Sequence, residues 1–473
     1  MSAKTAKPQK EKIPKNIMNA AWILVLGAIM PMLDSTMVNI AINHLSRDFG
    51  ASLSAIQWVI TGYVLSIAIT VPIAGWAAQK FNGKFLMIGA NVIFLICSIA
   101  CGLSWSIPSM VFFRVVQGIG AGIIMTLVMT LIVEIAGQGY MGRLISVIGL
   151  PTMLGPILGP VIGALIIQFV SWRWLFFVNV PVGIIAIIMM AWKLPNFVPS
   201  NVKAKFDFIG ITLLGAASAS LIYGITEAAK DHTFNNSSTI TFVIAGVAIL
   251  IAYIIYAAIR GDRAILPLKL FKVKNFSAAS VGLFLAGIAT NGPMMLLPLF
   301  FQNVKGFDVL YAGLLLIPQG VGMLVARPLI GKMVDKVGAR NVTLISLAIA
   351  VIGTIPFTFF GPDASLIVIS LVLFIRGIGI GGVTIPMMTD SYTGMEKQAI
   401  SQASVGTRIV QNIGGAFGSA VLATIVSISI ANQKPSVEVM ASAYNAGFVV
   451  ALALCVVMVI PALFLTNKKA AKK

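Results

Sequence analysis

Charged residues are scarce in this sequence. They make up 10% of its 473 residues, whereas a soluble domain usually carries about 25%. Acidic residues are the scarcest, with 14 Asp and Glu against 33 Lys and Arg, which gives a net charge of +19. Hydrophobic residues fill 58% of the chain, and the mean hydropathy is +0.98. This composition excludes an ordinary soluble enzyme.

Cysteine and histidine are also rare. The three cysteines, Cys97, Cys101 and Cys455, all lie inside apolar runs, where they usually serve as small packing residues. The two histidines lie near expected loops and form no cluster. This pattern excludes a disulfide framework and a cysteine or histidine metal site, and no nucleotide-binding loop occurs. We therefore expect no metal and no cofactor.

What the sequence has instead is a series of apolar runs of about 20 residues, each long enough to cross a bilayer as a helix. The first follows a lysine-rich tail and is too long for the apolar core of a cleaved signal peptide. We predict 14 spans, at 17–43, 55–79, 84–103, 107–136, 142–168, 173–194, 207–228, 240–260, 275–302, 308–330, 341–361, 364–389, 404–432 and 443–466.

The distribution of basic residues supports this count. With the N-terminus in the cytoplasm, the cytoplasmic tails and loops hold 24 Lys and Arg, and the outer loops hold 5. Lys and Arg favour the cytoplasmic side of membrane proteins. We therefore expect a multi-pass protein of the cell membrane with both termini in the cytoplasm. The basic charge then reflects the lipid bilayer and not nucleic acid.

Two short repeats indicate that the chain contains two related halves. After the second and tenth predicted spans, glycine and two basic residues recur with the same spacing, as Gly75, Lys80 and Lys84 and as Gly331, Lys336 and Arg340. A looser repeat pairs Arg114 and its glycine-rich continuation with Arg376 and the glycines after it. Parallel halves with a ligand site between them are typical of transporters.

We therefore predict an all-α polytopic membrane protein whose 14 helices are arranged as six, two and six. Its expected parts are a basic tail (1–16), a six-helix bundle (17–194), two inserted helices with their cytoplasmic loops (195–274), a second six-helix bundle (275–466) and a short tail (467–473).

Charges inside the predicted spans are candidate functional groups, because a charge at the bilayer centre costs about 2.5–3.5 kcal/mol. Asp34 is the one acid placed deep in a span, and Arg114 lies at a similar depth in the fourth span. Two interpretations remain open: a static ion pair between two helices, or a titratable carboxylate that faces a water-filled cavity beside Arg114. Asp207 and Asp335 are expected at helix starts, where the helix dipole favours an anion.

The fifth predicted span contains two Gly-Pro pairs, Gly155-Pro156 and Gly159-Pro160, followed by Gly163. Glycines spaced by four permit close contact between helices, and prolines loosen the backbone hydrogen bonding. This pattern indicates a bendable, tightly packed helix.

Four stretches together resemble the 14-helix drug:proton antiporters of the major facilitator superfamily. They are Leu33–Asn39, Arg114–Gly122, the Gly-Pro-rich fifth span and Trp172–Gly183. The resemblance covers essentially the whole chain and implies the major facilitator fold. It implies proton coupling by Asp34, for which the residues themselves indicate Arg114 as the tuning partner, and it makes the fifth span the antiporter motif (Gly155, Pro156, Gly159, Pro160 and Gly163).

The same resemblance implies a cytoplasmic gate in the two repeated turns, made of Gly75, Lys80, Lys84, Gly331, Asp335, Lys336 and Arg340. Gln79 stands in the first turn where the family usually has Asp, so the charge of the usual gate contact is missing there. The second turn retains Asp335.

We expect a proton-coupled antiporter that exports amphipathic, cationic organic compounds or drugs by alternating access and acts as a monomer. The substrate cavity is expected to include Asn39, Tyr63, Gln117, Met125 and Asn291. The alternative is a proton-coupled exporter or symporter of a specific metabolite or lipid-like molecule. A membrane-embedded enzyme such as a lipid-linked transferase would need clustered acids or a metal site in a loop, and the sequence has neither.

Overall fold

The computed structural model describes residues 13–51, 53–136, 144–145, 159, 162–163, 165–202, 205–231, 233–430 and 436–467. Within these ranges every regular element is a helix, as the sequence predicts. The first half contains α1 (Lys15–Met37), η1 (Val38–Ala41), α2 (Ile42–Phe49), α3 (Leu53–Lys80), α4 (Gly83–Gly102), α5 (Ile107–Ala136), α7 (Trp174–Phe177) and α8 (Asn179–Lys193).

Two helices, α9 (Phe208–Asp231) and α10 (Ser237–Arg260), follow the first half, and the short turns η2 (Gly261–Arg263) and η3 (Leu268–Lys272) lead from them into the second. That half contains α11 (Lys274–Asn303), α12 (Val309–Leu314), α13 (Ile317–Val337), α14 (Ala339–Thr354), η4 (Ile355–Thr358), α15 (Leu366–Tyr392), α16 (Lys397–Ile430), α17 (Val437–Val457) and α18 (Val459–Leu463).

Thirteen helices of the described chain are long and apolar enough to cross a membrane. They correspond one by one to 13 of the 14 predicted spans, and most bounds agree within a few residues. The remaining predicted span, 142–168, lies mostly outside the described residues. The multi-pass helical architecture is therefore confirmed.

The helix bounds differ from the prediction by six or seven residues at the ends of α1 and α13 and at the starts of α16 and α17. The first predicted span continues to residue 43, but α1 ends at Met37, and α2 follows as a separate helix that exposes His44, Arg47 and Asp48 and buries Leu45. A helix with one polar and one apolar side belongs at the membrane surface. Helix α13 continues to Val337, seven residues past the predicted end, and α17 begins at Val437, six residues before the predicted start. Helix α16 begins at Lys397, seven residues before the predicted start at 404, and its early turns include Ser401, which contacts α3.

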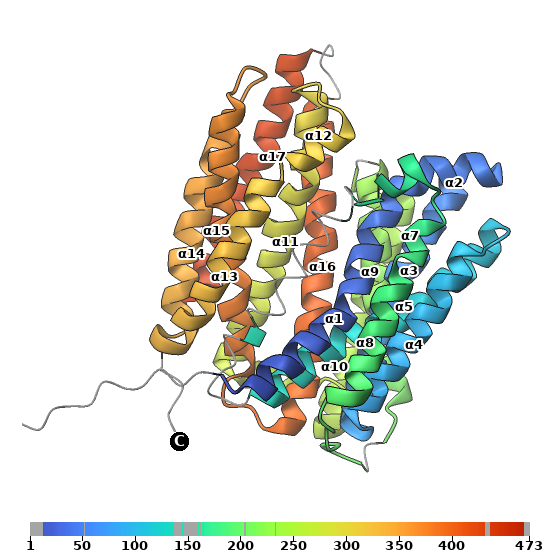
Figure 1. Cartoon of the computed structure of the whole chain (residues 1–473). Helices are drawn as coiled ribbons and strands as arrows, with labels where there is room; N and C mark the ends of the chain where they lie inside the picture. The colour runs from blue at the N-terminus through green and yellow to red at the C-terminus, as the bar shows by residue number, and fades with distance from the viewer. Residues whose placement is uncertain are drawn as a thin grey trace, which may run out of the picture.

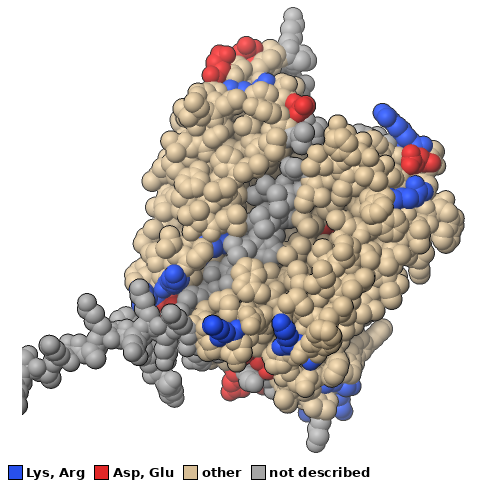
Figure 2. Space-filling view, in the orientation of Figure 1, with Lys and Arg blue, Asp and Glu red and all other residues tan. Residues whose placement is uncertain are grey.

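The side surface of the molecule is apolar. Figure 2 shows a broad band with few charged side chains between the charged groups that gather toward the two ends of the visible face. Large apolar side chains are exposed in several of the helices, for example Ile188 of α8, Ile251 of α10 and Ile367 of α15. Such exposure suits helices that face lipid hydrocarbon, where the backbone polar groups are satisfied within each helix. We call the end at which α1 begins the cytoplasmic end, following the charge distribution of the sequence.

Each half uses the same helix pairs. In the first half α5 packs against α3 and α4, and in the second half α15 packs against α13 and α14. The two bundles stand side by side, with α11 and α16 of the second half toward the first (Figure 1). Helix α9 packs against both α3 and α16, and α10 packs on α9. The inserted helices therefore lie along the line where the halves meet.

Candidate functional site: a buried ion pair and a central cavity

Glycines in α5 bring the neighbouring helices close to Arg114. A Cβ atom added at Gly118 would lie 2.7 Å from the Tyr63 carbonyl oxygen of α3, and one at Gly120 would lie 3.0 Å from the Ala90 carbonyl oxygen of α4. Such close approach needs residues without a side chain. The arginine one turn before Gly118 is thereby enclosed, with 1% of its surface exposed.

Arg114 forms a buried ion pair with Asp34 of α1, whose exposed fraction is 0%. The same guanidinium donates to Gln117 Oε1 at 2.8 Å and to the Val59 carbonyl oxygen at 3.2 Å. Its Cζ atom lies 3.9 Å from the centre of the Tyr63 ring, which is a cation–π distance. The sequence predicted that Asp34 and Arg114 lie at similar depth, and the structure brings them into contact.

Asn179 of α8 extends this polar network. Its Nδ2 donates to Asp34 Oδ1 at 3.4 Å and to Ser98 Oγ of α4 at 3.0 Å. Gln117 Nε2 also approaches Asp34 Oδ1, at 3.5 Å. The network therefore connects α1, α3, α4, α5 and α8, so that a change at Asp34 acts on most helices of the first half. Asn179 lies within the stretch Trp172–Gly183, which carried part of the family resemblance, but the sequence alone assigned this residue no role.

The second half has no equivalent ion pair within its described residues. Arg376 of α15 is buried and donates to Gln319 Oε1 at 2.9 Å and to the Ala289 carbonyl oxygen at 3.4 Å. Gly377 contacts the Gln319 backbone of α13 as Gly118 contacts that of Tyr63 in α3. By this packing Arg376 occupies the position of Gln117 and not that of Arg114, which corrects the register of the looser sequence repeat.

A cavity of about 290 Å³ lies between the two halves. Six methionines give it a soft apolar lining: Met32, Met125, Met129, Met294, Met323 and Met388. Its polar lining includes Arg327 of α13, Arg408 of α16, Asn291 of α11, Gln411 and Asn412. Ligand pockets commonly have volumes of about 300–1,000 Å³ and combine an apolar lining with a few polar groups. The cavity fits a small organic ligand.

The expected cavity residues divide into three groups. Met125 and Asn291 line the cavity. Tyr63 and Gln117 do not, since both belong to the network around Arg114, where Tyr63 lies beneath the guanidinium and Gln117 accepts from it. The side chain of Asn39 lies outside the described residues. Arg327 and Arg408, which also line the cavity, received no role from the sequence, although a lone arginine inside an apolar helix is a signal that could have marked them.

Asp34 does not face the cavity in this conformation. It is fully buried, whereas the cavity reaches α1 at Met32. The side chain of Asp34 is enclosed because Arg114, Gln117 and Asn179 all donate to it. The interpretation of a carboxylate open to a water-filled cavity is therefore wrong for the conformation described, and any influence of Asp34 on the cavity passes through the helices.

The antiporter motif is only partly described. Gly155, Pro156 and Pro160 lie outside the described residues. A Cβ atom at Gly159 would lie 1.9 Å from Thr36 Oγ1, and one at Gly163 would lie 3.3 Å from the Met37 carbonyl oxygen. These two glycines thus permit a close contact with the outer part of α1, which agrees with the tight packing predicted from their spacing.

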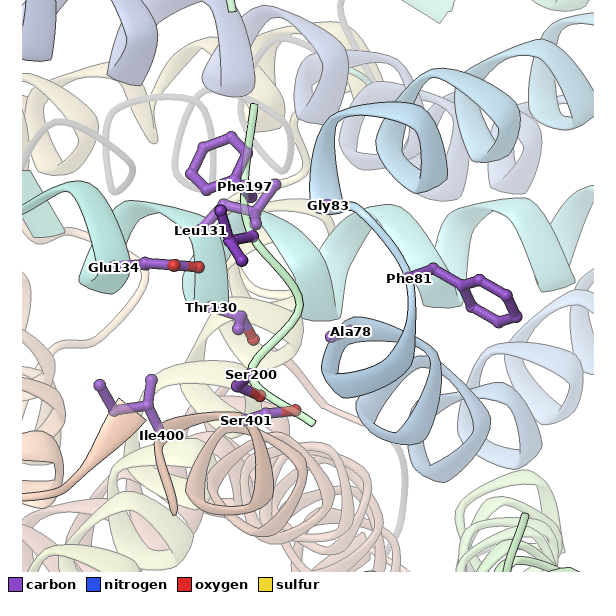
Figure 3. Close-up of a pocket in the computed structure, with 11 residues that line it drawn as sticks. Ala78, Phe81, Gly83, Thr130, Leu131, Glu134, Phe197, Ser200, Ile400 and Ser401 are labelled. Atoms are coloured by element: carbon purple, nitrogen blue, oxygen red, sulfur yellow. The ribbon is translucent and has the colours of Figure 1, made fainter. Parts of the chain in front are cut away.

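Two hydrogen bonds join the halves at the cytoplasmic end. The Ser401 hydroxyl of α16 donates to the Gly75 carbonyl oxygen of α3 at 2.7 Å. The hydroxyls of Thr130 in α5 and Ser404 in α16 lie 2.9 Å apart. Figure 3 shows Thr130 and Glu134 of α5, Ser401 of α16 and Ser200 of the segment after α8 around a small pocket. Its volume is about 20 Å³, close to the roughly 10–15 Å³ that one water needs, so this end is closed.

The first repeated turn lies beside this closed end. The backbone N–H of Asn201 donates to the Gln79 carbonyl oxygen at 3.0 Å, and the Gln79 side chain is buried. Lys80 Nζ lies 5.2 Å from the centre of the Trp76 ring, and the backbone N–H of Lys84 donates to Asn82 Oδ1 at the start of α4. Gly75 thus contacts the other half directly, while Lys80 and Lys84 organise the turn itself.

The second repeated turn corrects one expectation. Asp335 lies in the last turn of α13, which ends at Val337, and so it is not at a helix start. Asp207 does precede a helix as expected, and its Oδ1 accepts from the Gly210 backbone N–H at the start of α9 at 3.1 Å. Gly331 is buried in α13, Lys336 is exposed, and the Arg340 backbone N–H donates to the Thr466 carbonyl oxygen at 3.2 Å.

The family model of the Major Facilitator Superfamily matches residues 24–419. The chain belongs to this superfamily. A protein of this superfamily is a membrane transporter. The chain is 32% identical over 416 residues to the uncharacterized MFS-type transporter YhcA of Bacillus subtilis, covering 88% of this chain and 78% of that protein. It is 27% identical over 500 residues to a multidrug resistance protein B homolog of Mycobacterium tuberculosis, covering 98% of this chain and 92% of that protein.

Another relative is the multidrug export protein EmrB of Haemophilus influenzae, 28% identical over 401 residues, covering 84% of this chain and 78% of that protein. Among solved structures, the human organic anion transporter MFSD10 matches with a TM-score of 0.65 and 14% identity, covering 94% of this chain and 100% of that one. The proton:xylose symporter XylE matches with a TM-score of 0.63 and 17% identity, covering 94% of this chain and 96% of that one. These structures show that the fold is that of the major facilitator superfamily.

Proposed function

We propose that this transporter is a proton-coupled antiporter that exports amphipathic organic compounds across the cell membrane by alternating access. Relatives named multidrug resistance or multidrug export proteins over most of the chain support export of such compounds. The methionine-rich cavity between the halves supports the same proposal, because flexible thioether side chains adapt to ligands of different shape.

The observation that carries the proton-coupling part is the buried pair of Asp34 and Arg114. Removing one partner of a buried ion pair leaves the other charge uncompensated, which costs about 3–5 kcal/mol. Protonation of Asp34 neutralises the carboxylate in the same way and leaves the Arg114 guanidinium without its counter-charge. Loss of this pairing destabilises the present arrangement of the helices that hold the pair. It therefore favours the rearrangement that a proton-driven transporter requires.

Helix α5 connects this pair to the cavity and to the closed end. Arg114 lies near its outer part, Met125 and Met129 line the cavity, and the Thr130 hydroxyl contacts Ser404. From residue 114 to residue 125 the helix rises by about 17 Å at 1.5 Å per residue. The proton and the substrate therefore act on the same helix at different levels, and coupling runs through the movement of α5.

One chain contains both halves, the cavity and the ion pair, so we infer that it functions as a monomer.

In the conformation described, contacts of Gly75 with Ser401 and of Thr130 with Ser404 close the cytoplasmic end. Alternating access requires that these contacts break when the cavity opens toward the cytoplasm.

The test is transport by purified protein in proteoliposomes. Protein inserted inside-out, in vesicles with an acidic interior, should accumulate a fluorescent organic substrate, and addition of substrate should release protons from the vesicles. Asp34→Asn should abolish both proton release and gradient-driven accumulation. It leaves the Arg114 charge unpaired and so costs stability, but Asn has nearly the same shape, and insertion and folding are checked by abundance in the membrane and by size-exclusion chromatography. Asp262→Asn is the matched control, since Asp262 pairs with Lys269 on the exposed surface. Undiminished proton release by Asp34→Asn would refute the coupling role of Asp34.

A further inference from the structure

The charge of the central cavity differs from that expected for a transporter of cations. Two arginines, Arg327 of α13 and Arg408 of α16, contribute to its lining. Among the described residues around it, no Asp or Glu is present. Two acids lie two residues from a lining residue: Asp34, near Met32, is enclosed with Arg114, and Asp390, near Met388, is buried and accepts from Thr466. A cation that enters the cavity would meet positive charge without a compensating carboxylate.

Arg327 lacks the partners that the other buried arginines have. Its exposed fraction is 5%, and its Nε atom has no hydrogen-bond partner; Arg376 Nε has none either, but both Nη atoms of Arg376 donate. Arg114 is paired with Asp34, and Arg376 donates to Gln319 and to a backbone carbonyl, whereas no ion pair or side-chain hydrogen bond of Arg327 or Arg408 occurs within the described ranges. A buried guanidinium is costly to leave unpaired in the membrane. Both groups therefore have unused capacity to bind an anion.

The helix packing around the cavity holds Arg408 and the neighbouring amides in place. A Cβ atom added at Gly287 of α11 would lie 2.9 Å from the Gln411 carbonyl oxygen of α16. This close contact fixes α16 against α11, so that Arg408, Gln411 and Asn412 reach the same cavity as Asn291. The polar groups lie on the second half, while Met32, Met125 and Met129 of the first half supply an apolar wall.

We propose that the cavity selects amphipathic organic anions. The guanidinium groups of Arg327 and Arg408 bind a carboxylate, sulfonate or phosphate group, for which their planar arrangement of donors is suited. The methionines pack against the apolar body of the ligand. The cavity of about 290 Å³ suits a small organic acid and is too small for a phospholipid with two acyl chains. This inference rests on the proposed function only in identifying the cavity as the site of transported compounds.

The proposal also changes the electrical character of transport. Exchange of one proton inward for one monovalent cation outward moves no net charge. Exchange of one proton inward for one monovalent anion outward moves two positive charges inward, and the inner-negative potential drives both movements. Transport of an organic anion should therefore respond strongly to membrane potential.

A matched pair of fluorescent probes tests the selectivity directly. 8-Anilinonaphthalene-1-sulfonate and N-phenyl-1-naphthylamine share the same ring skeleton, but only the first carries a sulfonate; ethidium supplies the cation. Binding is measured with purified protein in phosphatidylcholine nanodiscs, with empty nanodiscs subtracted. The sulfonate should bind at least about tenfold more tightly than either other probe, because charge-assisted hydrogen bonds are the strong ones.

Arg327→Gln and Arg408→Gln should each weaken sulfonate binding by about tenfold and leave binding of N-phenyl-1-naphthylamine unchanged. Lys272→Gln, which removes one positive charge from an exposed turn, should leave both unchanged. If a glutamine variant does not fold, Arg327→Lys and Arg408→Lys are tested in its place. These variants keep the positive charge but lose the planar guanidinium. Tighter binding of ethidium, absence of sulfonate binding, or sulfonate binding independent of both arginines would overturn the proposal.

The two proposals fail in different ways. Ethidium transported in exchange for protons, without arginine-dependent sulfonate binding, would retain the antiporter and overturn anion selectivity. Arginine-dependent sulfonate binding without proton-driven transport would retain the anion site and overturn the antiporter. Electrogenic transport of the sulfonate, measured with a potassium gradient and valinomycin, would support both.

Discussion

Gly75 of α3 lies so close to Val405 of α16 that a Cβ atom on the glycine would come within 2.1 Å of the valine Cγ2 atom. The hydrogen bond from Ser401 to the Gly75 carbonyl oxygen lies one turn away along α16. The glycine of the first repeated turn is therefore a direct contact between the two halves. Its lack of a side chain permits the cytoplasmic end to close.

Gly75→Ala should weaken closure of the cytoplasmic end, because the added methyl group overlaps Val405. A cysteine placed at Ser404 should react faster with a thiol reagent applied from the cytoplasmic side. Transport should be slower. Helices in close contact tolerate little added volume, and overpacking typically costs about 1–3 kcal/mol. Gly75→Ala combined with Val405→Ala should restore both properties, since the smaller residue makes room.

Gly89→Ala is the matched control, because a Cβ atom there would meet nothing within 4 Å. It should leave accessibility and transport as in the unsubstituted protein. Normal transport by Gly75→Ala at normal abundance would show that this contact does not limit the cycle.

Arg114→Ala should destabilise the protein by about 3–5 kcal/mol, because it leaves the Asp34 carboxylate buried without a partner. The measurement is thermal unfolding of the purified protein, followed by its intrinsic tryptophan fluorescence. The double variant Asp34→Asn with Arg114→Gln should recover most of that stability, since no buried charge remains, but it should not recover proton-driven transport. Recovery of transport by the double variant would mean that the pair is only structural.

Asp335→Asn should slow transport while leaving membrane insertion intact. The carboxylate lies in the last turn of α13, two residues before the helix ends at Val337, where the negative end of the α13 dipole disfavours an anion. An acid at a position that costs stability is expected to serve the gate, as the repeated turn predicts. Transport rate and abundance in the membrane are measured together. Asp262→Asn, the same change on an exposed turn, serves as the comparison, and equal rates for both variants would refute a gating role for Asp335.

Both termini should lie in the cytoplasm. Single cysteines at Lys15 and Lys469, each in a variant without the native cysteines, should resist an impermeant thiol reagent added to intact cells and react after the cells are opened. A cysteine at Lys305, in a predicted outer loop, should react in intact cells. Labelling of either terminal cysteine from outside would contradict an even number of spans with the N-terminus inside.

Much of the fold follows from the sequence alone. The length of the apolar runs determines which segments can cross a bilayer, because backbone groups in lipid must be paired within a helix. The bias of Lys and Arg predicts the orientation of these segments. Asp34 and Arg114 could be paired from the sequence because both are charged and lie at the same depth, where an unpaired charge is costly.

The helix packing alone decided which residues meet in the cavity. Arg327 and Arg408 share a cavity although 80 residues separate them in the chain, and Gln117 and Tyr63 face Arg114 instead of that cavity. The placement of Arg376 opposite Gln319 depends on the glycine contact between α13 and α15, and only the structure shows that Ser401 of α16 meets Gly75 of α3. Hydropathy and charge report the solvent that surrounds a segment, so they identify the spans and predict their orientation. The direction in which a buried side chain points depends on the rotation of its helix against its neighbours, and only the tertiary structure determined that.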